Sequence, residues 1–134
     1  MVDAPEVLKS FLAAQTALTA LLGDRLWPQR TFPIEGYVPS DGQALVFRSR
    51  GSGTVDYSGN VYTLSWAFKA YGESELDADR LYRTLFDVLQ DAKGAGLFRA
   101  ALEVGGQPLQ EPIIGWDYSL SYWTTMMPTY YEPA

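Results

Sequence analysis

The densest group of side chains that could do chemistry is acidic: Glu73, Glu75, Asp77 and Asp79 follow one another closely. Carboxylates at this spacing could act as a general acid and base, or could bind a hard cation such as Ca²⁺. A calcium-binding loop needs a glycine and a terminal glutamate in register, and this segment has neither. Acids in the first turn of a helix are also stabilised by the helix dipole. The sequence favours this second interpretation, and we expect neither a metal nor a cofactor.

Two residue types are missing altogether, because the chain has no histidine and no cysteine. A thiolate nucleophile, a disulfide framework, a Cys/His zinc site and an imidazole base are therefore excluded. The glycine-rich runs at 51–54 and 94–96 lack the Lys-Ser/Thr pair of a phosphate loop and do not open a helix after a strand. These absences predict a protein that is not an enzyme.

The net charge is −6, and residues 100–134 contain four acids and no lysine or arginine. A protein that grips nucleic acid by neutralising phosphates needs the opposite balance. Four arginines nevertheless fall at positions 25, 30, 48 and 50, close to only two acids, Glu35 and Asp41. They could form a phosphate-binding patch or could pair with an acidic surface on another copy of the chain. The overall charge favours pairing, with Arg48 and Arg50 as the first candidates.

Aromatic residues crowd the last nineteen positions. A strand can bury only one of its two faces against its own helices. We expect the buried face to be the one that carries Trp116, Tyr118 and Tyr122. The remaining aromatics then need a different cover, which predicts either a protein interface or an aromatic-lined ligand cavity. These remaining aromatics are Trp123, Tyr130 and Tyr131.

The elements that position these residues follow from hydrophobic periodicity. Spacings of three and four predict helices over 5–22, started by Asp3 and ended by Gly23, and over 75–92, capped by Ser74. The buried stripe of the second helix takes in Leu76, Leu81, Tyr82, Leu85, Phe86, Val88, Leu89 and Ala92. Alternation predicts strands over 45–48, 61–71, 98–104 (closed by a Gly105-Gly106 turn) and 115–126. Residues 50–60 are expected to form an exposed hairpin tip with Tyr57 on it.

This order (helix, two strands, helix, two strands) predicts an α+β fold: an antiparallel sheet of about four strands with two helices packed on one face. At 134 residues, 1–134 is expected to be a single domain. No run is long and apolar enough to cross a membrane. The acidic N-terminus does not resemble a signal peptide, so we expect the chain to stay inside the cell at first. The segment after Met127 is expected to be frayed or docked on a partner.

The layout resembles the tail terminator (tail completion) proteins of long-tailed phages. The resemblance is carried by Gly23-Asp24-Arg25-Leu26-Trp27-Pro28 after the first helix, by Phe32-Pro33, and by Gly115-Trp116-Asp117 at the start of the last strand. It extends over most of the chain through the order and spacing of these motifs. Members of this family often have an extended strand directly after the proline segment, whereas 36–42 here is expected to be a loop.

The resemblance implies a structural protein of the virion that assembles as a hexameric ring on the tail tube. Such a ring stops tube polymerisation, meets the head-side connector protein and lets DNA pass without binding it specifically. Another neck component, such as a head-completion adaptor, is the alternative within this class, and a small-molecule-binding α+β domain is the alternative outside it. The expected interface residues are Arg48, Arg50, Tyr57, Trp123, Tyr130 and Tyr131, and the expected lumen residues are Glu103, Asp117, Glu73 and Glu75.

Overall fold

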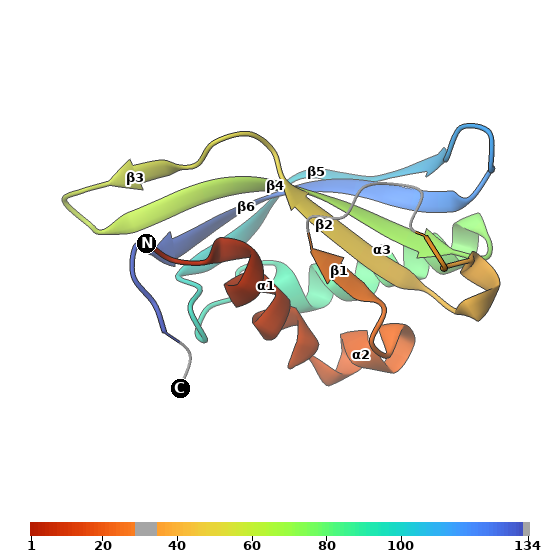
Figure 1. Ribbon diagram of the computed structural model, residues 1–134, viewed down its shortest axis with the longest axis horizontal. Coiled ribbons are helices and arrows are strands. Elements are labelled where there is room, and N and C mark those ends of the chain that lie inside the picture. The colour runs from red at the N-terminus through yellow and green to blue at the C-terminus, as the bar shows by residue number, and fades with distance from the viewer. Residues whose placement is uncertain (29–34, 133–134) are drawn as a thin grey trace.

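The computed structural model describes residues 1–28 and 35–132 (Figure 1). The expected α+β class is confirmed, with more elements than the sequence predicts. They are α1 (Ala4–Ala13), α2 (Thr16–Leu22), β1 (Leu26–Pro28), the 3-10 turn η1 (Pro39–Asp41), β2 (Ala44–Ser49), β3 (Thr54–Asp56), β4 (Val61–Gly72), α3 (Glu75–Leu89), β5 (Arg99–Gln110) and β6 (Asp117–Pro128).

All six strands belong to one sheet, in which the order is β1-β2-β4-β6-β5 and β3 pairs with the outer part of β4. Every pairing is antiparallel except that of β1 with β2. The three helices lie together against one face of the sheet, and none of the described helices covers the other face (Figure 1). The long strands β4 and β6 pair over their whole length and form the spine of the molecule.

The predicted helix over 5–22 is two helices, broken at Ala14–Gln15. Gln15 has an extended backbone (φ −88°, ψ 105°) and its side-chain amide donates to the Phe11 carbonyl, 3.2 Å away. The buried residues Phe11, Leu18 and Leu22 stay in helical phase across the break, so periodicity could not reveal it. The predicted caps are confirmed: Asp3 accepts from the Glu6 amide and Ser74 from the Asp77 amide.

The hydrophobic core lies between the helices and the sheet. It includes Leu8 and Leu12 of α1, Leu81 and Leu85 of α3, and Phe68 of β4. Two buried indoles complete it, each with its N–H satisfied: Trp66 donates to Thr125 Oγ1 at 2.7 Å and Trp123 to Ser121 Oγ at 2.9 Å. Leu76 and Phe86, expected in the buried stripe of α3, are 66% and 38% exposed.

The expected orientation of the last strand is wrong. The structure places the odd-numbered residues of β6 against the helices, so Trp123 is fully buried and cannot be an interface residue. The side that carries Tyr118 and Tyr122 faces away from the helices. Alternation gives the period of a strand but does not say which face is inside, and here both faces carry large aromatics.

The Gly105-Gly106 pair is not a turn either, because β5 continues through it to Gln110. The register with β6 shifts on both sides of Val104, as at a β-bulge. A Cβ on Gly106 would lie 2.7 Å from the Tyr82 ring and 2.6 Å from Ser119 Oγ. Glycine at this position therefore lets α3 pack closely on the sheet. The hairpin turn falls instead at residues 111–116.

Candidate functional site

The most distinctive surface is the sheet face opposite the helices, which we call the open face. Its central side chains are half-exposed rather than buried, including Ser65, Ala67, Leu120, Tyr122 and Thr124. An aromatic cluster covers one end of this face, and charged residues of β2, of the segment after it and of β5 lie beside its centre. An uncovered sheet face with apolar and charged side chains is suited to contact another protein rather than to hold a small ligand.

The aromatic cluster consists of Trp27, Tyr37, Tyr71, Trp116 and Tyr118. Edge-to-face pairs join Tyr37 to Trp27 (5.4 Å between ring centroids) and to Trp116 (5.5 Å). Tyr71 packs against Trp116 at 5.9 Å and against Tyr118 at 5.6 Å. These geometries are the favoured ones for aromatic pairs. The cluster ties the segment after β1 to the turn end of the β5–β6 hairpin.

A carboxylate anchors this cluster. Glu111, at the end of the hairpin, accepts hydrogen bonds from Lys69 Nζ at 2.8 Å and from the Tyr71 hydroxyl at 2.6 Å. Lys69 also lies 4.7 Å from the centre of the Tyr118 ring. Burial, followed by the hydrogen bond to Glu111, raises the pKa of Tyr71 far above its usual range. Burial also raises the pKa of Tyr118 and brings that of Tyr37 to about 12.

These shifts predict a loss of stability in alkali. Tyrosines in the unfolded chain ionise near pH 10. Between that pH and about 12 the folded chain holds the Tyr37 proton more tightly than the unfolded chain does. The free energy of unfolding should therefore fall as the pH rises above about 10, by roughly 1.4 kcal/mol per pH unit for each such tyrosine. Urea unfolding of the wild type and of Tyr37→Phe at about pH 8 and pH 11 tests this. The variant should lose less stability in alkali, and equal losses would contradict the assignment.

The charged residues beside the centre of the open face are Arg48, Arg50 and Glu103. Arg50 is already paired within the chain, since its guanidinium lies 3.1 Å from Glu103 and stacks 4.0 Å from the centre of the Tyr122 ring. Arg48 projects from β2 and is exposed. Within the part of the chain that the structure describes, its guanidinium has no ion-pair partner. Of the two predicted pairing arginines, Arg48 is the one with its charge available, whereas Arg30 lies outside the described residues.

The motif residues that carry the family resemblance shape two turns. Gly23 ends α2 with φ +59°, and Asp24 and Arg25 lead directly into β1. The Arg25 guanidinium donates to the Gln43 carbonyl at 2.8 Å, so it braces β1 against the start of β2. Trp27 enters the aromatic cluster, and Pro28 ends β1.

In the second motif, Gly115 has φ +70° at the hairpin turn and Trp116 packs in the same cluster. Both motifs therefore serve the fold.

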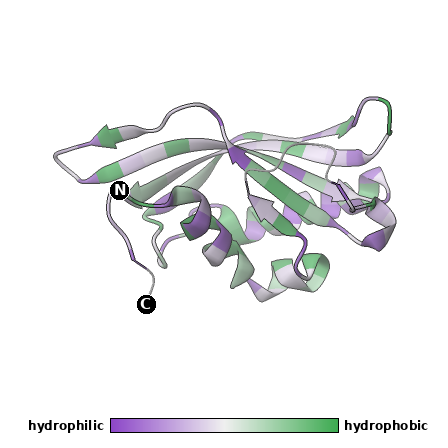
Figure 2. Cartoon of the chain, viewed as in Figure 1, coloured by the Kyte–Doolittle hydropathy of each residue, from purple (hydrophilic) through white to green (hydrophobic). Residues whose placement is uncertain are grey.

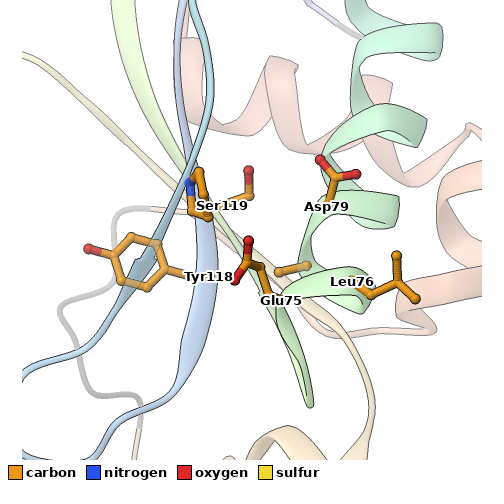
Figure 3. Close-up of a pocket in the computed structure, with 7 residues that line it drawn as sticks. Glu75, Leu76, Asp79, Tyr118 and Ser119 are labelled. Carbon is orange, nitrogen blue, oxygen red and sulfur yellow. The ribbon is translucent and has the colours of Figure 1, made fainter.

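The expected lumen residues do not lie together. Glu103 belongs to the open face, whereas Asp117 and Glu75 line a hollow between the start of α3 and the β5–β6 hairpin. Glu73 is exposed in the turn just before α3. The adjoining groove has a volume of about 360 Å³. Figure 3 shows Glu75 and Asp79 of α3 on one side of it and Ser119 of β6 on the other. Three of the four acids, Glu73, Glu75 and Asp117, thus lie at one end of the molecule, and Glu103 lies apart from them.

The remaining interface candidates have mixed surroundings. Tyr57, at the tip of the long β3–β4 hairpin, is 87% exposed, and Tyr130 is 79% exposed. The segment after Met127 is docked on its own chain: the Val2 amide donates to the Thr129 carbonyl, and Tyr131 packs against the core. The sequence does not predict a functional role for the exposed pair Ile113-Ile114 in the β5–β6 turn. The signal that could have found it is the position of two apolar residues between Pro112 and Gly115, which are typical turn residues.

Among the residues described, no three His, Cys, Asp or Glu side chains are grouped so that they could hold a metal ion. The helices found in this part of the chain are also too short or too polar to span a membrane.

Comparison with known proteins gives one informative result. No protein-family model matches the sequence, and no curated protein matches it. Among solved structures, a chain from the virion of a native gene transfer agent (GTA) particle has a similar fold, with a TM-score of 0.64. The match covers 90% of this chain and 90% of that chain, at 12% sequence identity. At this identity the likeness establishes a shared fold.

Proposed function

We propose that the chain is a structural protein of a phage-like particle, and that residues 1–134 form one tail-terminator-like domain. In this proposal six copies form a ring on the end of the tail tube, stop its polymerisation and present a surface to the head-side connector. The protein works in the neck of the virion and is assembled in the host cytoplasm. DNA passes through the ring without specific binding.

The observation that carries this proposal is the fold shared with a chain of a GTA virion over nine-tenths of both chains. The surface fits an assembly role: none of the described residues covers the centre of the open face, and two hairpins extend beyond the body of the molecule at opposite ends (Figure 1). The net charge of −6 suits a ring through which DNA must slide, because like charges repel. Glu73, Glu75, Asp117 and Glu103 remain the proposed acidic residues of that path.

A ligand-binding role has less support. Most of the aromatic residues that could line a ligand cavity are packed against one another in the core and in the aromatic cluster. The groove beside α3 is open to solvent, and several of its walls are polar, including Glu75, Asp79 and Ser119 (Figure 3). Ligand sites are more often enclosed and apolar.

If Arg48 pairs with acids of a neighbouring copy, reversing its charge should weaken the assembly while leaving the subunit folded. For Arg48→Glu we expect a free energy of unfolding within about 0.5 kcal/mol of the wild type, because the side chain is exposed on a strand. The oligomer should dissociate at lower salt than the wild-type oligomer does. Light scattering across a salt series measures this.

Arg80→Glu is the control, since it makes the same charge change on the exposed side of α3. If the oligomers of the two variants are equally stable, Arg48 is not part of the interface.

Tube capping itself can be tested with tail-tube subunits from the same particle. Added during tube growth, the protein should shorten the tubes and appear as a ring at one end of each. Tubes of unchanged length would contradict capping, and binding to the head vertex instead would favour the head-completion adaptor.

A further inference from the structure

The turn between β5 and β6 holds an apolar side chain in solvent at a strained position. Ile113 is fully exposed and has φ +74°, and the adjacent Ile114 is 41% exposed. A β-branched residue rarely adopts a positive φ, because its Cβ crowds the backbone. Figure 2 shows this tip as a hydrophobic end on the hairpin. Such strain is usually found where it serves a function.

An apolar hollow lies at the opposite end of the same two strands, where β5 begins and β6 ends. Its volume is about 410 Å³, and its apolar walls come from Leu97, Phe98, Pro128 and Tyr131. Phe98 is 51% exposed at its edge. Gly96 shapes the floor, because a Cβ there would lie 2.7 Å from Val7 and 2.8 Å from the Tyr131 ring. The hollow can accept a branched aliphatic side chain.

The tip cannot reach the hollow of its own chain. The strands β5 and β6 each have twelve residues, so at about 3.3 Å per residue the ribbon is roughly 40 Å long. The turn that forms the tip lies at one end of this ribbon (Figure 1). The residues that line the hollow lie at the other end, just before β5 begins and where β6 ends. Contact between them therefore requires two molecules.

We propose that the Ile113-Ile114 tip of one copy inserts into the Leu97–Phe98 hollow of a second copy. Both surfaces are apolar, both are left uncovered by the described residues, and they occur on the same chain. A contact between two different patches of the same protein is a head-to-tail contact. When each copy is rotated relative to the last by a whole fraction of 360°, repeated contacts of this kind close into a ring. The inference rests on the proposed ring and assigns one contact within it.

Single-cysteine variants test the contact directly, because the wild type has no cysteine to give background crosslinks. Ile113→Cys and Phe98→Cys are purified separately, reduced, mixed and oxidised. If the tip enters the hollow, a mixed disulfide dimer should form several-fold more than in the control pair of Ile113→Cys with Tyr57→Cys. Tyr57 is a suitable control because it is even more exposed and lies on the other hairpin. A yield equal to that of the control overturns the contact.

Ile113→Gly adds a second readout that does not depend on crosslinking. Glycine adopts φ +74° freely, so the melting temperature of the subunit should rise by a few degrees. The oligomeric fraction should fall several-fold because the inserted side chain is lost. A variant that is more stable and assembles normally would overturn the proposal, as would crosslinking of the tip to tail-tube subunits instead of to a second copy.

The two proposals fail in different ways. Wild-type rings together with control-level crosslinking would overturn this contact and leave the ring intact. Absence of both rings and crosslinks would overturn the contact and the proposed function together.

Discussion

Trp123→Ala is expected to lower the free energy of unfolding by about 3–5 kcal/mol. The indole is fully buried, packs near the rings of Phe68 and Phe86, and donates its N–H to Ser121 Oγ. Truncation leaves a large cavity between α3 and the sheet, and it also removes the donor to that hydroxyl. Because small domains are stable by only about 5–15 kcal/mol, the loss is a large part of the total. Urea unfolding measures it.

Tyr130→Ala is the matched control, because it removes an aromatic ring that is 79% exposed in the same part of the chain. Its free energy of unfolding should stay within about 0.5 kcal/mol of the wild type. The opposite result for Trp123→Ala, with normal stability and loss of assembly, would place Trp123 at a subunit interface, as the sequence alone predicts.

Gly72→Ala is expected to destabilise the fold by about 1–3 kcal/mol or more. Gly72 ends β4 where the chain turns into α3, and an added Cβ would lie 2.5 Å from the backbone nitrogen of Ala78. It would also lie 2.8 Å from the Cβ of Asp77. Neither atom belongs to the far end of a flexible side chain, so α3 would have to move away from the sheet. Thermal or urea unfolding measures the change.

Gly59→Ala provides the comparison near the other end of β4. There an added Cβ has only an ordinary contact, 3.4 Å from Val61 Cγ2. We expect its free energy of unfolding to be unchanged or slightly higher, since alanine restricts the unfolded chain. If the two variants were equally stable, the close packing of α3 against Gly72 would be wrong.

The sequence predicts the helices and the long strands well where the periodicity is strong. The strand predicted over 61–71 matches β4, and the caps at Asp3 and Ser74 are as expected. Local patterns could not show that β1 pairs in parallel with β2, because three residues carry no period. They also could not show that β5 passes through Gly105-Gly106, since the reason lies in the Tyr82 ring of α3.

The candidate site was harder to predict than the fold. The sequence predicts that Arg50 meets another copy, yet Glu103, more than fifty residues away in sequence, pairs with it within the same chain. The sequence predicts the wrong inner face for β6, because serines such as Ser119 and Ser121 are typical of a surface, whereas here both are buried under the helices. The Ile113-Ile114 tip is visible in the sequence as two apolar residues, but only the structure shows that nothing in the described chain covers Ile113.

The central claim is that this chain builds a ring. Negative-stain imaging of the purified protein, alone and on the ends of tail tubes, tests that claim most directly. The account predicts end-on views of a closed ring with sixfold symmetry and an open centre. A protein that stays monomeric, forms no ring on the tubes, and melts at a higher temperature in the presence of a small molecule would contradict it.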